Sequence, residues 1–141
     1  MAPGARAADV SLASIAAREF RKLRKAMRAL PPDPSDEALH AVRIRGKRAR
    51  YAAELAEGVV RKPARRFVRH AKRFQDVIGE HQDAVVAEER VRGLLGKVDG
   101  AQAHFAAGRI VERERERRRA ARATFPAAWK RLAKSGKRAW S

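Results

Sequence analysis

The stretch that decides the fold is PARRFVRHAKRFQDVIGEHQDAVV, residues 63–86 of a chain of 141. Within it one set of residues recurs at alternating steps of four and three: Phe67, Ala71, Phe74, Ile78, His81 and Val85. An α-helix has about 3.6 residues per turn, so this spacing places the whole set on one face over about five turns. Pro63 suits the first turn of a helix, where its missing N–H has no partner in any case. The stretch therefore predicts a long amphipathic helix from Pro63 to about Leu95.

The same spacing predicts three more helices. A first runs from about residue 8 to residue 30, where Pro31-Pro32-Asp33-Pro34 stops it. Asp33 is the expected cap of a second helix, which has Pro34 in its first turn and ends near Gly58. A fourth follows the break at residues 96–100 and runs to Lys134, with Phe125, Trp129 and Leu132 as anchors.

Short links between long helices predict an all-α fold, an antiparallel four-helix bundle with long helices. We expect the bundle to occupy residues 11–134, between a flexible N-terminus (1–10) and a basic C-terminal tail (135–141). The composition agrees, because the apolar share of 45% is dominated by Ala, a good helix former. The chain has no cysteine and no apolar stretch of about 20 residues, so we expect a soluble, cytoplasmic protein without disulfides or thiolate metal sites.

Positive charge is the strongest functional signal. The formal net charge is +18, and residues 39–75 contain twelve Arg or Lys against only Glu54 and Glu57. Such a density of like charge disfavours the folded state through self-repulsion unless an anion neutralises it. The composition therefore predicts a polyanionic partner: nucleic acid, an anionic membrane surface or inorganic polyphosphate.

The second predicted helix arranges its charges as a ladder. At about 100° per residue, His40, Arg43, Lys47 and Arg50 fall within an arc of about 80°. We expect this ladder to border an apolar face that contains Ile44, Tyr51 and Leu55, with Arg48 among them. Arg offers a planar fork of donors and Lys a compact charge, and both suit a chain of phosphates. The alternative is a solvated helix face with a few salt bridges, which the shortage of nearby acids disfavours.

Two other features favour structural roles. His81 lies on the apolar stripe, which is more typical of a core histidine satisfied by a hydrogen bond than of a ligand. The run ERERERRR at residues 112–119 is typical of a solvated face with ion pairs across one turn. The expected pairs are Glu112–Arg115, Glu114–Arg118 and Glu116–Arg119.

Two motifs carry a family resemblance. ALHAVRIRGKRARY at residues 38–51, followed by FQDVIGEHQDA at residues 74–84, resembles the second, C-terminal half of the CHAD (conserved histidine α-helical domain) family. The likeness extends from about Leu12 to Leu132. The resemblance implies one half of a two-bundle domain that binds inorganic polyphosphate in a basic cleft, often beside triphosphate-processing proteins of the CYTH type. It implies these anion contacts: His40, Arg43, Lys47, Arg48, Arg50, Lys72 and Arg73.

The resemblance also leaves questions of completeness and partner. A full domain of the family has about twice as many helices, so we expect either a fragment or a homodimer, or a separate partner that supplies the missing half. Polyphosphate granules are an expected location. No phosphate-binding glycine loop, acidic magnesium site or catalytic triad is visible, so we expect a binding module rather than an enzyme, with no cofactor and no metal. Non-specific binding of nucleic acid is the competing function.

Overall fold

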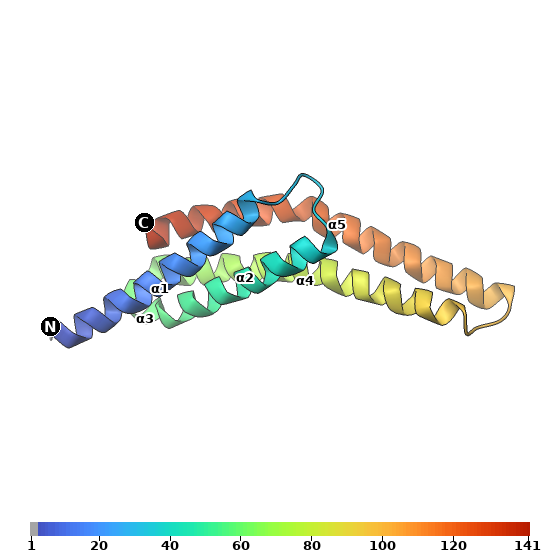
Figure 1. Ribbon diagram of the computed structural model, residues 1–141, viewed down its shortest axis with the longest axis horizontal. Coiled ribbons are helices and arrows are strands. Elements are labelled where there is room, and N and C mark those ends of the chain that lie inside the picture. The colour runs from blue at the N-terminus through green and yellow to red at the C-terminus, as the bar shows by residue number, and fades with distance from the viewer. Residues whose placement is uncertain (1–2) are drawn as a thin grey trace.

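The computed structural model describes the backbone of residues 3–141 and the side chains of residues 11–141, and over that range it is all-helical (Figure 1). The all-α prediction is confirmed. The helices are α1 Pro3–Arg28, α2 Asp36–Leu55, α3 Glu57–Val60, α4 Lys62–Leu95 and α5 Ala101–Trp140. Four of them are the long helices expected from the sequence. The fifth, α3, is a single turn in the link between α2 and α4, and Arg61 follows it with a positive φ of 66°.

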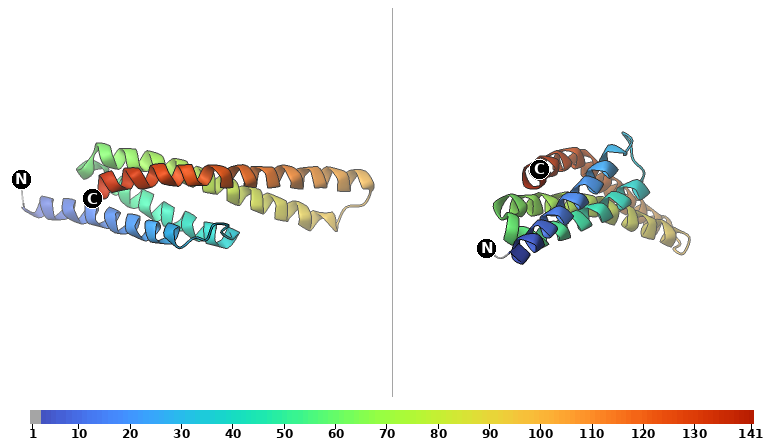
Figure 2. Two further views of the ribbon diagram at one scale, coloured as in Figure 1. Left: turned by 90° about the horizontal axis from the view of Figure 1, so that it is seen from above. Right: turned by 60° about the vertical axis from the view of Figure 1, so that its left-hand side comes forward.

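The four long helices pack as a ring of neighbours. α1 packs on α2 and α5, α2 packs on α4, and α4 packs on α5, which is the arrangement of a four-helix bundle. α4 and α5 are longer than the other two, and together they form a hairpin that projects beyond the bundle (Figures 1 and 2). The N-terminal half of α4 and the C-terminal half of α5 therefore lie in the bundle, while the 96–100 link lies at the far tip.

The core is built around aromatic rings of α4. Phe67 and Phe74 are fully buried together with Leu23, Ile78 and Leu132. The Phe74 ring lies 5.4 Å from the ring of Phe125 and 5.7 Å from that of Trp129, so the aromatic anchors predicted on α5 contact the core. Burial of side chains of this size stabilises a fold by roughly 1.5–3 kcal/mol each.

The N-terminal end of α2 differs from the prediction by two residues. Ser35 caps the helix, because its backbone is extended and its Oγ accepts a hydrogen bond of 3.1 Å from the Ala38 N–H. Asp33, the predicted cap, lies in the link instead, where its carboxylate binds Arg122. Asp36 occupies the first turn, at the positive end of the helix dipole.

Among the described residues, helices extend into both predicted terminal segments. α1 begins at Pro3 and therefore includes most of the expected flexible segment 1–10, while residues 1–2 lie outside the described residues. At the other end the predicted boundary at Lys134 is wrong, because α5 continues to Trp140. Gly136 is buried against the Phe20 ring of α1, and the Trp140 ring packs edge-on against Phe67 at 5.5 Å. These contacts join residues 135–140 to the bundle.

Candidate functional site

Three rungs of the predicted ladder lie together. Arg43, Lys47 and Arg50 are half-buried on one flank of α2. The core face of the helix, next to that flank, consists of Val42, Gly46, Ala49 and Ala53. Gly46 lets α2 approach α4 closely, since a Cβ there would lie 3.3 Å from the Phe74 ring. The three cations therefore follow the side of α2 that adjoins α4, and we call this set the α2 ladder.

Few acids neutralise the α2 ladder. Arg50 has Glu54 at 3.5 Å, one turn away, whereas Arg43 and Lys47 form no ion pair with residues 11–141. The Nε atoms of Arg43 and Arg50 are buried and have no hydrogen-bond partner within that range. Arg43 and Lys47 are therefore partly removed from water and unpaired within residues 11–141, which is electrostatically unfavourable, and a bound anion would relieve this cost.

His40, the fourth rung, lies among acids. It is exposed, and it lines a surface depression of about 370 Å³ together with Asp36, Glu37, Gln82, Val85 and Glu89. Three carboxylates in this depression make its local charge opposite to that of the α2 ladder. His40 therefore lies in line with the α2 ladder along the helix, but its surroundings are negatively charged.

Arg48 lies on the outer face of α2, about 100° around the helix from Lys47. Its neighbours on this face are Ile44, Tyr51 and Leu55, whose exposed fractions are 42%, 50% and 66%. The Arg50 guanidinium lies over the Tyr51 ring at 5.0 Å and links this face to the α2 ladder. The apolar border predicted for the ladder therefore exists, but it is exposed to solvent.

Lys72 and Arg73 lie on different flanks of α4. Arg73 lines a depression with Asp76, Glu80 and Arg117, on the side of α4 that faces α5. Lys72 is exposed and lies one turn before Gln75, which is half-buried and has an unpaired, buried Oε1. Gln82, two turns after Gln75 on the same flank, shares the depression with His40, so this flank faces α2. The structure therefore places Lys72 on the α2 side of α4 and Arg73 on the α5 side.

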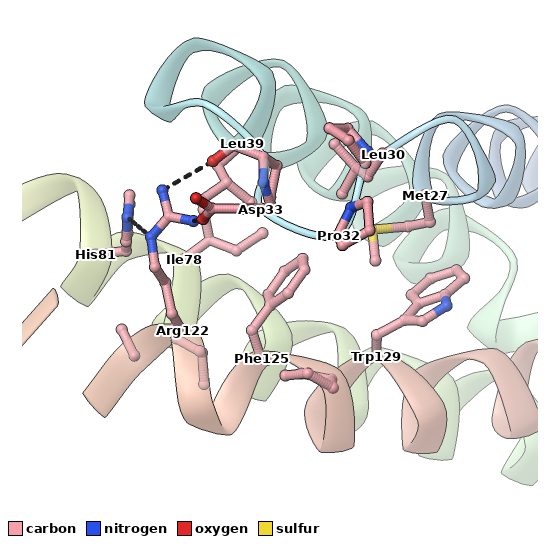
Figure 3. Close-up of a pocket in the computed structure, with 15 residues that line it drawn as sticks. Met27, Leu30, Pro32, Asp33, Leu39, Ile78, His81, Arg122, Phe125 and Trp129 are labelled. Atoms are coloured by element: carbon pink, nitrogen blue, oxygen red, sulfur yellow. Dashed lines mark hydrogen bonds and ion pairs between the residues drawn. The ribbon is translucent and has the colours of Figure 1, made fainter. Parts of the chain in front are cut away.

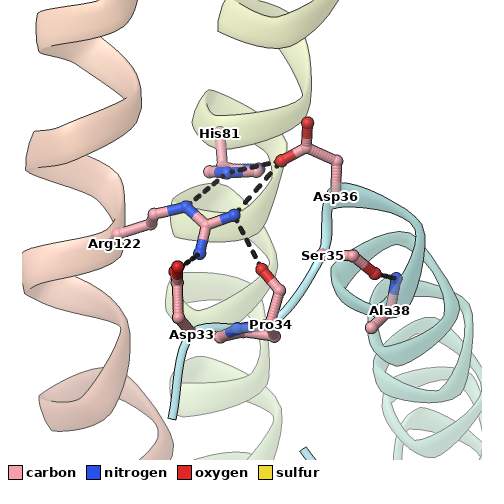
Figure 4. A network of polar contacts seen from close by, with 7 residues as sticks. All are labelled: Asp33, Pro34, Ser35, Asp36, Ala38, His81 and Arg122. Carbon is pink, nitrogen blue, oxygen red and sulfur yellow. Dashed lines mark hydrogen bonds and ion pairs between the residues drawn. The ribbon is translucent and has the colours of Figure 1, made fainter. Parts of the chain in front are cut away.

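Arg122 of α5 is the centre of a polar network that the sequence analysis did not predict. Its guanidinium donates to the Asp33 carboxylate at 3.2 Å, the Pro34 carbonyl at 2.9 Å and the Asp36 carboxylate at 3.2 Å, while its Nε donates to His81 Nε2 at 3.1 Å (Figure 4). One side chain therefore fastens the link between α1 and α2 to both α4 and α5. The partners come from distant parts of the chain, so sequence spacing carries no signal for this network.

His81 is a core histidine with a hydrogen bond, as predicted. Burial is the largest cause that lowers its pKa, and the positive charge of Arg122 lowers it further. The neutral ring accepts at Nε2, so its proton is on Nδ1, a buried atom without a partner among residues 11–141. His81 and Arg122 stand at one end of an apolar cavity of about 340 Å³, which Phe125 and Trp129 line from α5 (Figure 3).

The charge run on α5 connects the two helices of the hairpin. Of the three predicted pairs only Glu116–Arg119 is present, at 2.5 Å. Arg115 instead binds Glu88 of α4 at 2.8 Å, and Arg117 binds Glu80 of α4 at 3.0 Å. Burial acts to raise the pKa of Glu88, but the hydrogen bond and charge of Arg115 outweigh it and hold this pKa below its ordinary value. Glu80 and Glu88 therefore form ion pairs within the outer half of the hairpin, away from the α2 ladder.

The described residues hold neither a metal-binding cluster nor a membrane-spanning helix. No group of three or more His, Asp or Glu side chains within residues 11–141 is arranged to hold a metal ion. None of the helices in the described range is both long and apolar enough to cross a membrane.

Comparison with known proteins identifies the family. The model of the CHAD domain matches residues 2–92, which cover the α2 ladder and most of α4, while α5, over which the likeness is expected to continue to about Leu132, lies outside the match. Two uncharacterised proteins of Mycobacterium tuberculosis, from strains CDC 1551 / Oshkosh and ATCC 25618 / H37Rv, are each 32% identical to the chain over 105 residues. The match covers 74% of the chain but 19% of each relative, and no solved structure matches. Because the family model matches well over half of its length, the chain belongs to the CHAD domain family.

Proposed function

We propose that this chain binds inorganic polyphosphate along the flank where α2 adjoins α4. The observation that carries the proposal is the α2 ladder: Arg43, Lys47 and Arg50 are half-buried on one flank, and among the described residues Glu54 is the one acid that forms an ion pair with any of them. The CHAD domain is associated with polyphosphate binding at the level of the family. The charge arrangement and the family association point to the same ligand.

The geometry of the ladder suits a repeating anion. Residues four and three apart on a helix rise by about 6 and 4.5 Å, so the three cationic groups form a row rather than a ring. A row can contact successive phosphates of an extended chain, whereas a compact anion such as free phosphate would reach only one or two rungs. Arg can bind two phosphate oxygens at once through its planar guanidinium. Lys72 adds a cation from the facing flank of α4.

The remaining residues implied by the resemblance lie around this row. His40 extends it toward the N-terminus of α2, Arg48 is on the outer face and Arg73 is on the α5 side of α4. We therefore rank their contributions below those of Arg43 and Lys47. A ranking of single substitutions by loss of affinity tests this order.

The test is a titration of the protein with polyphosphate of defined length. Arg43→Gln/Lys47→Gln should lower the affinity at least tenfold, since each charge-assisted contact is worth roughly 1.5–3 kcal/mol. The matched control is Arg90→Gln/Arg113→Gln, which removes the same charge from exposed positions on the projecting hairpin. Equal losses in the two variants would mean that binding depends on net charge alone, and the ladder assignment would be wrong. Melting curves of both variants check that the fold is retained.

Competition distinguishes polyphosphate from nucleic acid. Duplex DNA also presents a regular row of phosphates, and the net charge of +18 attracts it as well. At equal phosphate concentration, polyphosphate should displace DNA from the protein. Displacement in the opposite direction would assign nucleic acid as the ligand. Salt dependence does not separate the two, because both polyanions release counterions on binding.

We propose binding without catalysis. The three side chains of the α2 ladder are all cationic, and the carboxylate beside them, Glu54, pairs with Arg50. No group of three or more His, Asp or Glu side chains within residues 11–141 is arranged to hold a metal ion that could activate water. Incubation of the protein with polyphosphate and Mg²⁺ or Mn²⁺ should release no inorganic phosphate. Steady release that scales with protein concentration would make the chain a phosphohydrolase.

A second copy of the chain is our proposed partner for the outer face of α2. Ile44, Tyr51 and Leu55 expose apolar surface directly beside the α2 ladder, and such surfaces are typical of interfaces. A twofold pairing there would bring two ladders together as the walls of one cleft. The high positive charge opposes pairing, so polyphosphate should promote it. Light scattering should show a dimer in the presence of polyphosphate; a monomer under all conditions would refute it.

Cellular context follows from the same ligand. A CYTH-type triphosphate-processing protein is a candidate partner, and association with polyphosphate granules in the cytoplasm of a bacterium is the candidate location. Co-purification with polyphosphate granules, weakened in the Arg43→Gln/Lys47→Gln variant, tests the location.

A further inference from the structure

A second cationic groove lies between α4 and α5. It has a volume of about 270 Å³ and is lined by Arg66, Arg69, His70, Arg131, Lys134, Ser135 and Arg138. Two segments about 65 residues apart in sequence contribute to it, the first half of α4 and the last turns of α5. We call it the α4/α5 groove. It contains five permanent cations and no acid.

The cations of the α4/α5 groove have no neutralising partner within residues 11–141. None of the five forms an ion pair or a side-chain hydrogen bond with a residue in that range. Neither segment has any Asp or Glu, since residues 62–75 and 117–141 contain none. The outer half of the hairpin behaves differently, because there Glu80 and Glu88 of α4 pair with Arg117 and Arg115 of α5.

His70 shows how closely these cations are grouped. It is half-buried and lines the groove, and after burial the causes that lower its pKa are the charges of Arg69, Arg131 and Arg66, which come from both helices. Arg138 also lies near the negative end of the α5 dipole, but that interaction is worth only about 0.3–1 kcal/mol for one charge. The dipole therefore leaves most of the like-charge repulsion in the groove in place.

The groove and the α2 ladder are on opposite flanks of α4. His70 and Arg66 lie on the side of α4 that faces α5, whereas Gln75 and Lys72 lie on the side that faces α2. The fully buried Phe67 and Phe74 separate the two flanks. A short linear anion that occupies one surface therefore cannot contact the other.

We propose that the α4/α5 groove is a second binding site for a phosphate chain, so that one molecule of this protein holds two segments of polyphosphate. The inference rests on the proposed function, because it assigns the same ligand class to a second surface. Two sites on opposite flanks would connect separate polyphosphate chains, or distant parts of one long chain, into a network.

The test uses short polyphosphate and the ring signals of His70 in an NMR pH titration. In the intact protein, saturating ligand should raise the pKa of His70, because bound phosphate offsets the charges of Arg66, Arg69 and Arg131. At protein concentrations where light scattering shows a monomer, the stoichiometry should be two short chains per protein. Arg69→Gln/Arg131→Gln should reduce it to one and leave the remaining affinity unchanged. Arg43→Gln/Lys47→Gln should also reduce it to one while the His70 response persists.

The outcomes separate the two proposals. Absence of any polyphosphate binding by the intact protein would refute the proposed function and the second site together. One bound chain per protein with an unmoved His70 signal would refute the second site alone. A His70 signal that responds to duplex DNA but not to polyphosphate would overturn the ligand class. Melting curves of the variants confirm that loss of a site is not loss of the fold.

Discussion

Gly136→Ala tests the packing of the last turns of α5 against α1. A Cβ at this position would lie 2.4 Å from two ring carbons of Phe20, Cε1 and Cζ. Carbon atoms ordinarily approach to about 3.5–4.0 Å, so the overlap is on the order of 1 Å. Phe20 has little room to move, because it is 3% exposed and its ring packs edge-on against Phe67 at 5.6 Å.

Two opposing effects determine how much Gly136→Ala changes the free energy of unfolding. Replacement of Gly by Ala inside a helix stabilises it by roughly 1 kcal/mol, whereas overpacking of a dense core typically costs about 1–3 kcal/mol. With two ring carbons in conflict we expect the upper end of that range, and a net loss of about 2 kcal/mol in the free energy of unfolding. Gly108→Ala is the matched control, because Gly108 is in the same helix and its added Cβ would meet nothing within 4 Å. It should gain about 1 kcal/mol.

Urea unfolding followed by far-UV circular dichroism measures both variants against the parent. The two variants should differ by about 3 kcal/mol, because they share the helix-propensity gain and only one creates a clash. If Gly136→Ala is as stable as Gly108→Ala, the end of α5 does not pack on Phe20. Residues 135–141 would then be a tail outside the bundle, as the sequence predicts.

Three further predictions concern the core and its polar network. Arg122→Lys keeps the charge but loses the planar guanidinium that reaches Asp36 and the Pro34 carbonyl. It should therefore lower the free energy of unfolding, measured in urea, by about 2 kcal/mol. An unchanged value would show that the network does not contribute to stability. Because burial and Arg122 lower the pKa of His81, the unfolded chain takes up its proton at higher pH than the folded chain does. Stability should therefore be full above about pH 6.5 and fall as the pH decreases toward the lowered pKa, by at most about 1.4 kcal/mol per unit, with a smaller fall in His81→Gln. Phe74→Ala should cost about 3–5 kcal/mol, measured by thermal melting with Phe105→Ala, an exposed aromatic position, as the neutral control.

The helical fold could be predicted from periodicity and breakers. The spacing from Phe67 to Val85 identified the stripe of α4 that faces the core, and the prolines after Leu30 marked the end of the first stripe. The end of α5 could not, because its packing depends on Gly136, whose small size matters only against a ring from α1. Local sequence carries no information about a partner more than a hundred residues away.

The candidate site, like the fold, could be predicted from the sequence only in part. Helical phasing identified the row of Arg43, Lys47 and Arg50, but it placed the apolar face of α2 on Ile44, Tyr51 and Leu55. The true core face is built from Val42, Gly46, Ala49 and Ala53, small residues that give a weak hydrophobic signal yet permit close contact with Phe74. A prediction based on side-chain hydrophobicity therefore assigns the core face to the larger side chains, which are exposed in the structure.

Tertiary arrangement also decides which cations act together. Lys72 and Arg73 are adjacent in sequence, yet about 100° of helix rotation assigns them to different flanks of α4. Conversely, Arg69 and Arg131 are far apart in sequence and line one groove. Charge counting along the chain finds the excess of positive charge but cannot divide it into surfaces.

Binding of a phosphate chain along the α2 ladder would be visible in a crystal structure of the protein with polyphosphate of defined length. We predict phosphate oxygens within hydrogen-bond distance of Arg43, Lys47 and Arg50, with the chain running along α2 beside α4. Ordered phosphate bound elsewhere, with these three side chains free of it, would show that the α2 ladder is not the binding site.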